Sequence, residues 1–165
     1  MTVIVNFSAK QLRHPGCVGH IGEALKRSGL EARSLSLDVT ESVFVDAFEA
    51  NTLALKQIEN LGVRLSIDDF GTGYSSLSYL KRLPAKVLKI DKSFVGGLGE
   101  YEEDTVIVRM VVEIAHTPEM KVIAERVERE GQGTLLKVMG CDMAQGFHFA
   151  RPLPPEAVTE VLLAR

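Results

Sequence analysis

Short strand-like segments alternate with helix-like segments along the whole chain. The strand-like segments are apolar and rich in β-branched residues, and the helix-like segments repeat apolar residues every three or four positions. The strands are expected at residues 3–7, 35–40, 64–68, 87–91, 121–126 and 143–149. The helices are expected at residues 18–28, 47–61, 75–82, 102–116, 128–139 and 155–163. Consecutive strand–helix units predict an α/β fold with a parallel sheet and right-handed crossovers.

The strand-like segments carry polar or charged residues near their C-terminal ends. These residues are Asn6, Asp38, Asp68, Asp69, Lys89, Glu125 and Gln145. A (β/α)8 barrel brings the ends of all its strands to one face, whereas a doubly wound sheet concentrates its site at one switch point. The wide distribution therefore favours a barrel. Since a complete barrel has eight strands and typically about 250 residues, we expect a partial (β/α)8 TIM-like barrel with six of eight β/α units.

The composition narrows the class of protein further. A chain of 165 residues, 45% hydrophobic and 25% charged, is expected to form a single globular domain. Its net charge of −3 argues against DNA or RNA polymers and anionic membranes as general partners. No apolar run approaches the roughly 18 residues of a spanning helix, and Cys17 and Cys141 are too few for a disulfide framework. These features predict a cytoplasmic domain without a membrane segment.

Two adjacent carboxylates, Asp68 and Asp69, end the third strand and are followed by Gly71 and Gly73. Neighbouring strand residues point to opposite faces, so one acid is expected to face the interior, where a bare carboxylate is costly unless paired or metal-bound. The alternative is an Asp-rich turn that caps the next helix. This stretch alone does not decide between them, but the other polar strand ends favour a metal site.

Asn, Asp and Glu oxygens without His or Cys suit Mg2+ or Mn2+. Several carboxylates on one rim match two-metal hydrolysis of a phosphodiester, and Lys89 among them would hold a water or meet a phosphate oxygen. Each residue alone also has an ordinary structural interpretation. Asn6 would be a strand-end cap, Asp38 a helix cap, Lys89 a salt-bridge partner of Asp91, and Gln145 a loop hydrogen bonder.

Six motifs give the chain a resemblance to the EAL family, the cyclic di-GMP-specific phosphodiesterases of bacterial signalling. They are residues 5–12 (VNFSAKQL), 38–42 (DVTES), 68–77 (DDFGTGYSSL), 88–94 (LKIDKSF), 124–128 (AERVE) and 145–147 (QGF). They occur in family order, and the segment beginning at Asp68 is the most specific of them.

The resemblance implies roles for individual residues and a reaction. The implied ligands of a Mg2+ or Mn2+ pair are Asn6, Asp38, Asp68, Asp69 and Glu125. Lys89, Glu125, Gln145 and Asp69 are the implied catalytic residues, with Lys89 contacting the attacking water and Gln145 ordering the site. Glu41 is the implied anchor of the loop at residues 69–76. The implied reaction is hydrolysis of cyclic di-GMP to linear pGpG by water, without a covalent enzyme intermediate.

The chain departs from the family pattern in three places. The resemblance begins at the third barrel strand, so we expect the N-terminal part with the Glu-Ala-Leu motif and its metal-binding glutamate to be missing from residues 1–165. Asp38 stands where the family usually has Glu, and its shorter side chain withdraws the carboxylate by roughly 1.5 Å, the length of one C–C bond. Arg126 replaces the family's Gly. It would compete with the cations if it pointed inward, and the alternation of strand side chains favours an outward, solvated position.

These departures leave three functional hypotheses open. The first is an EAL phosphodiesterase whose isolated chain has negligible turnover, and the second is a degenerate module that binds cyclic di-GMP or a partner protein without hydrolysis. The third is a structural remnant without signalling activity. A six-stranded arc would also expose two strand edges, so we expect self-association or a marginal fold.

Overall fold

The computed structural model describes residues 2–44, 48–71, 80 and 82–163, and within them six strands form one parallel sheet. The strands are β1 (Val3–Asn6), β2 (Leu35–Thr40), β3 (Arg64–Phe70), β4 (Val87–Ile90), β5 (Lys121–Ala124) and β6 (Met143–Ala144). They lie in the sheet in sequence order, and every neighbouring pair is parallel. A doubly wound sheet reverses direction at its switch point, whereas a barrel sheet does not. The predicted partial α/β barrel is therefore confirmed.

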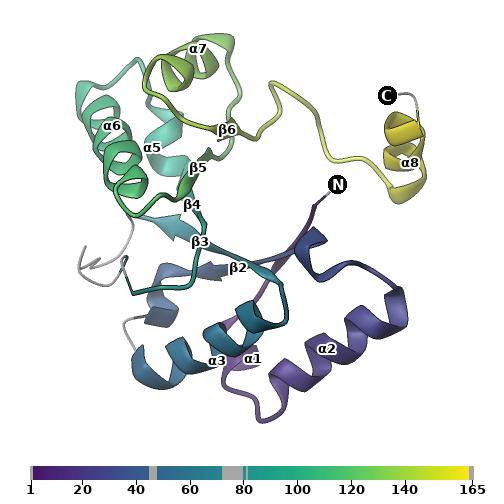
Figure 1. The fold of residues 1–165 in the computed structure, drawn as a ribbon. Coiled ribbons are helices and arrows are strands. Elements are labelled where there is room, and N and C mark those ends of the chain that lie inside the picture. The colour runs from purple at the N-terminus through teal and green to yellow at the C-terminus, as the bar shows by residue number, and fades with distance from the viewer. Residues whose placement is uncertain (1, 45–47, 72–79, 81, 164–165) are drawn as a thin grey trace.

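Helices connect the successive strands. They are α1 (Ala9–Leu12), α2 (Cys17–Ser28), α3 (Phe48–Asn60), α5 (Lys92–Gly96), α6 (Glu102–His116), α7 (Glu130–Val138) and α8 (Pro155–Leu163), with 3-10 turns η1 (Ala32–Ser34) and η2 (Glu41–Phe44). Figure 1 shows α2 and α3 beside the N-terminal strands, α6 and α7 beside the C-terminal strands, and α8 apart from both groups. The one-turn helices α1 and α5 were not predicted, because they are too short to show an apolar period. The helix predicted at 75–82 lies almost wholly outside the described residues.

The central strands are buried on both faces, but the two faces differ in chemistry. On one face the buried side chains are apolar, and they are Leu37, Val39, Leu65, Ile67, Leu88 and Ile90. On the other face the side chains are mostly polar, and they include Ser36, Asp38, Ser66, Asp68 and Lys89. The apolar face packs in the core with residues of α3 and α6, such as Ile58 and Val108. The polar face is the inner face of the partial barrel, and it is where the site forms.

The last strand is much shorter than the predicted range of 143–149, because the chain changes direction after Ala144. Gln145 still donates its backbone N–H to Ala124 O at 2.9 Å and accepts from Val127 N at 2.9 Å. Gly146 then passes so close to Val127 that a Cβ atom there would lie 2.2 Å from Val127 O and 2.3 Å from Val127 N. This close approach turns the chain and sets the position of Gln145 beside the end of β5.

The sheet has two edges, β1 and β6, and apolar surface lies near both ends of the chain. Val3, Ile4 and Val5 of β1 are 38–44% exposed. α8 has no buried residue, although its composition is apolar. None of the described helices is long and apolar enough to cross a membrane.

The Gly146 contact predicts a strong asymmetry between two glycine substitutions. Gly146→Ala should lower the free energy of unfolding by about 1–3 kcal/mol, because the new methyl group meets backbone atoms of Val127. Gly131→Ala, within α7 and with no atom within 4 Å of its Cβ position, should leave stability unchanged or raise it by up to about 1 kcal/mol. Urea unfolding monitored by circular dichroism measures both, and equal midpoints for the two variants would contradict the prediction.

Candidate functional site

A buried lysine joins carboxylates from three neighbouring parts of the sheet. Lys89 of β4 is 5% exposed. Its Nζ lies 2.5 Å from Asp38 Oδ2, 2.5 Å from Glu125 Oε1 and 3.2 Å from Asp68 Oδ1. The strand-end spacing in the sequence predicted that these four side chains would meet, and the parallel register brings them together. The suggested pairing of Lys89 with Asp91 is wrong, because Asp91 instead accepts hydrogen bonds from Ser93 as the N-cap of α5.

Asp38 is satisfied by protein groups on both of its oxygens. Besides the ion pair with Lys89 through Oδ2, its Oδ1 accepts a hydrogen bond from the Ser66 hydroxyl. Ser66 also lies 3.3 Å from the hydroxyl of Ser36. The interpretation of Asp38 as a helix cap is therefore wrong, since its carboxylate is 3% exposed and faces the inner side of the sheet. Ser66 was not predicted, although it stands two residues before Asp68 and so shares its face.

Asp68, Asp69 and Glu125 form an acidic cluster that could hold a metal ion. One oxygen from each lies within 4.8 Å of the others. Asp68 Oδ1 is buried and accepts no hydrogen bond from the described residues, although Lys89 lies 3.2 Å away. A buried carboxylate oxygen without a hydrogen bond is costly unless a cation lies beside it; Lys89 is one such cation, and a metal ion at the cluster would be a second. The donor set is purely carboxylate, so the cluster fits Mg2+ or Mn2+ better than zinc.

Adjacent aspartates reach one cluster because the strand is irregular at that point. Strict alternation predicts that only one of Asp68 and Asp69 faces inward. The register between β3 and β4 shifts between Ile67 and Phe70, and Asp69 has a φ of 54°. A bulge with a left-handed residue re-aims a side chain, so both acids reach the cluster.

The cluster perturbs the protonation of its members. Burial raises the pKa of Asp69, and the charge of Asp68 and a hydrogen bond with Asp91 raise it further. Burial also raises the pKa of Glu125, despite the opposing effect of Lys89. For Lys89, burial acts to lower the pKa, but the bonds to Asp38 and Glu125 outweigh it and raise the pKa well above its ordinary range. Lys89 is therefore a permanent cation that offsets part of the cluster's negative charge.

The remaining predicted site residues lie at the margin of this cluster. Asn6 ends β1 beside Asp38 in the register and is exposed, and no described side chain hydrogen-bonds with its amide. Glu41 is buried and accepts a hydrogen bond from Gly71 N at 3.0 Å, at the start of the loop it is predicted to anchor. Residues 72–79 of that loop lie outside the described residues. The tripeptide Glu23-Ala24-Leu25 lies within α2 with Glu23 exposed, so it is not a strand-end ligand segment.

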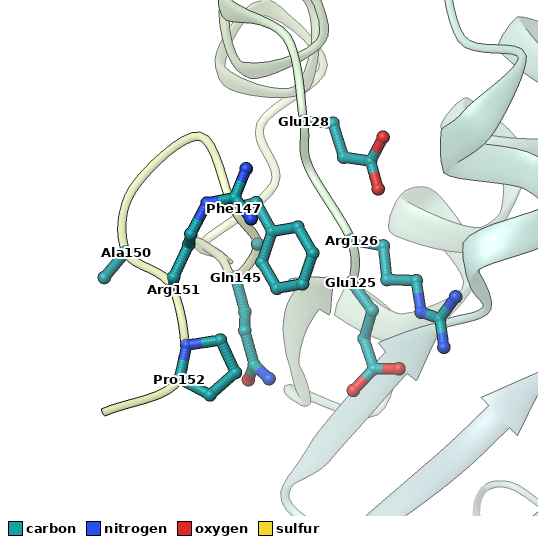
Figure 2. Close-up of a pocket in the computed structure, with 9 residues that line it drawn as sticks. Glu125, Arg126, Glu128, Gln145, Phe147, Ala150, Arg151 and Pro152 are labelled. Atoms are coloured by element: carbon teal, nitrogen blue, oxygen red, sulfur yellow. The ribbon is translucent and has the colours of Figure 1, made fainter. Parts of the chain in front are cut away.

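A pocket of about 500 Å³ opens beside Glu125. Its lining residues are Glu125, Arg126, Glu128, Gln145, Gly146, Phe147, Ala150, Arg151 and Pro152. Figure 2 shows Phe147, Arg151 and Gln145 on one side of the pocket and Glu125 and Arg126 on the other. The Arg151 guanidinium lies 5.2 Å from the centre of the Phe147 ring. Phe147 and Arg151 were not predicted as site residues, since Phe147 is apolar and Arg151 lies beyond the last expected strand.

Comparison with known proteins finds a matching family model, similar sequences and similar solved structures, each over most of the chain. The model of the family described as EAL domain matches residues 1–152. The chain is 46% identical over 154 residues to the bifunctional diguanylate cyclase/cyclic di-GMP phosphodiesterase MucR of Pseudomonas aeruginosa, which covers 93% of this chain and 22% of MucR. The structure of the PaMucR phosphodiesterase in complex with c-di-GMP has a TM-score of 0.92 at 45% identity, over 95% of this chain and 64% of that one.

A more distant structure is similar over most of the chain. Klebsiella pneumoniae BlrP1, solved as a manganese/cy-diGMP complex, has a TM-score of 0.84 at 32% identity, over 92% of this chain and 39% of that one. The chain spans about a fifth to a quarter of the length of the curated relatives it matches.

Removal of the central cation should destabilise the fold in a pH-dependent way. Lys89→Met leaves Asp38, Asp68 and Glu125 without their shared partner, and we expect a loss of about 3–5 kcal/mol in the free energy of unfolding at neutral pH. Without the ammonium group, which acts to lower it, the pKa of Glu125 rises further in the folded state above its value in the unfolded state. The free energy of unfolding of Lys89→Met is therefore highest at low pH, where the buried acids are protonated, and it falls as the pH rises. The deficit relative to the wild type should shrink as the pH approaches ~4.

Urea unfolding across this pH range measures the effect of Lys89→Met. Lys86→Met, an exposed position next to the same strand, is the matched control and should change stability by less than about 0.5 kcal/mol. A deficit that stays constant with pH would show that lost packing, and not charge, is the cause.

Proposed function

Since the chain belongs to the EAL domain family, with residues 1–152 matching the family model, we propose that it binds cyclic di-GMP together with Mg2+ or Mn2+. The observation that carries this proposal is the Asp68–Asp69–Glu125 cluster, in which one oxygen from each residue lies within 4.8 Å of the others and Asp68 Oδ1 accepts no hydrogen bond from the described residues. A cytoplasmic location belongs to the same proposal. MucR, of which the chain spans 22%, is named a cyclic di-GMP phosphodiesterase, and this supports the proposal.

The metal would be held by Asp68, Asp69 and Glu125. Bound there, it would activate water and offset the charge of a phosphodiester, so that hydrolysis of cyclic di-GMP to pGpG becomes possible. The chain's own residues prepare this site. Lys89 holds the Glu125 carboxylate in place, and Asp91 shares a hydrogen bond with Asp69. Cation binding would oppose the raised pKa of Asp69, since a metal-bound carboxylate is deprotonated.

The pocket beside Glu125 has groups that suit a nucleotide. The Phe147 ring offers a face for a planar base, and Arg151 and Arg126 offer guanidinium groups for phosphate oxygens. Gln145 lies between this pocket and the end of β5, where it can hydrogen-bond to the ligand or to a water. We assign binding of the substrate to this pocket and the chemistry to the adjoining cluster.

Hydrolysis by the isolated chain is proposed to be negligible. Asp38 is committed to Lys89 and Ser66, and it has one methylene less than the family's usual Glu. A shift of about 1 Å in a catalytic group can cost roughly a hundredfold in rate. The alternative function, a degenerate module that binds without hydrolysis, is favoured by the same engagement of Asp38.

Incubation with cyclic di-GMP and Mn2+ tests the proposal. We expect measurable binding by calorimetry and negligible pGpG by chromatography. Asp68→Asn should abolish the metal-dependent binding, because it removes a ligand charge from the cluster. Glu113→Gln makes the same carboxylate-to-amide change on the exposed side of α6 and should bind like the wild type. Appreciable pGpG would refute the low turnover, and absence of binding would favour a structural remnant.

We also propose that the chain self-associates through its apolar edge surfaces. β1 exposes Val3, Ile4 and Val5 on an edge strand, and α8 exposes Val158 and Leu162. Unpaired edge strands and contiguous apolar surface favour pairing with another chain. A second copy offers both a strand edge and an amphipathic helix.

Size-exclusion chromatography with light scattering should therefore give a mass of at least twice 18.1 kDa. Ile4→Lys places a charge on the edge strand and should shift the population toward the monomer. A wild-type monomer over a wide concentration range would contradict self-association without affecting the proposed ligand.

A further inference from the structure

Arg126 stands at the point where β5 ends and the ligand pocket begins. It follows Glu125 of the acidic cluster, is exposed, and lines the 500 Å³ pocket together with Glu125 and Gln145. It also lines a neighbouring pocket of about 410 Å³ that includes Lys92 and Arg129. Arg126 therefore connects two cavities on the same rim.

The backbone explains why Arg126 and Glu125 line one pocket. Regular alternation would send these neighbours to opposite faces. Arg126 instead has a φ of 53°, in the left-handed region that is unfavourable for a side chain with a Cβ atom. Figure 2 shows the two side chains leaving the chain on the same wall of the pocket. Arg126 is exposed, as expected for an outward side chain. It nevertheless lines the pocket next to Glu125 of the acidic cluster.

The arginines of this rim differ in what they contact. Arg129 is held by an ion pair with Glu100 and donates to Gly96 O at 2.7 Å, so it has a structural role. Arg151 stacks on Phe147. Within the described part of the chain, the Arg126 guanidinium has no carboxylate, carbonyl or ring partner. An arginine kept in an unfavourable backbone conformation, beside the cluster and without a protein partner, is placed to meet a ligand.

We propose that Arg126 is a binding residue that donates hydrogen bonds to a phosphate oxygen of the nucleotide held at the acidic cluster. This inference rests on the proposed function and deepens it. A guanidinium presents paired N–H donors that match phosphate geometry. Glu125 and Glu128 line the same pocket and repel a phosphate. The positive charge of Arg126 offsets this repulsion beside the cluster.

The test compares binding of cyclic di-GMP to the full chain and to Arg126→Asn by calorimetry in Mn2+. Asn tolerates a left-handed backbone, so the change removes the charge without adding strain. We expect a Kd roughly tenfold higher for the variant and a weaker dependence of Kd on KCl concentration. The unfolding temperature without ligand should stay equal or rise, because the backbone conflict of the arginine is relieved.

Two further variants distinguish the paired hydrogen-bond donors of Arg126 from its charge, and a local effect of that charge from a change in the net charge of the chain. Arg126→Lys keeps the charge without the paired donors and should give an intermediate Kd. Arg109→Gln, on the exposed side of α6, removes one positive charge elsewhere and should bind like the wild type. If the wild type binds and Arg126→Asn binds equally well, the role of Arg126 is refuted while the proposed function stands. If the wild type does not bind, the proposed function itself fails, and the role of Arg126 fails with it.

Discussion

The buried ammonium group of Lys89 is the interaction on which the inner face of this sheet depends. Three carboxylates from β2, β3 and the end of β5 lie around one cation. Without it they would repel one another in a poorly solvated space, where unpaired charges cost several kcal/mol each. The pairing holds the Asp38 and Glu125 carboxylates in position, while Asp68 and Asp69 retain oxygen atoms that could meet a cation. The proposed metal ligands therefore include residues that the ion pairs with Lys89 already use.

The acids around Lys89 differ in how fully the protein itself engages them, and this difference underlies the proposed function. Asp38 has protein partners on both of its oxygens, whereas Asp68 Oδ1 accepts no hydrogen bond from the described residues and has only the ion pair with Lys89 at 3.2 Å. The acids of this site are thus divided into one that stabilises the fold and a cluster that is prepared for a ligand. A site of this kind supports binding more readily than turnover, because geometry limits catalysis more strictly than affinity.

The sequence predicted the parallel sheet, its strand order and the meeting of Asp38, Asp68, Lys89 and Glu125, because strand-end position is a property of the local pattern. It did not predict the backbone irregularities at Asp69 and Arg126, where a positive φ sends neighbouring side chains to one side. The alternation of apolar and polar residues does not distinguish such a residue from a regular strand residue. Its positive φ depends on contacts with neighbouring parts of the sheet, which the local pattern does not contain. Phe147 and Arg151 were missed for the same reason, because the chain turns at Gly146 only through its contact with Val127.

The lysine-centred ion pairs also connect positions far apart in the chain. Asp38 and Lys89 are separated by 51 residues, and the contact requires β2, β3 and β4 to be aligned already. Such non-local contacts close long loops and form late in folding. Lys89 and its acids are then withdrawn from water only when the neighbouring strands have reached their final register. An error in strand pairing would leave these charges buried without partners, so the polar interior penalises misassembled forms of the sheet that an apolar interior would tolerate.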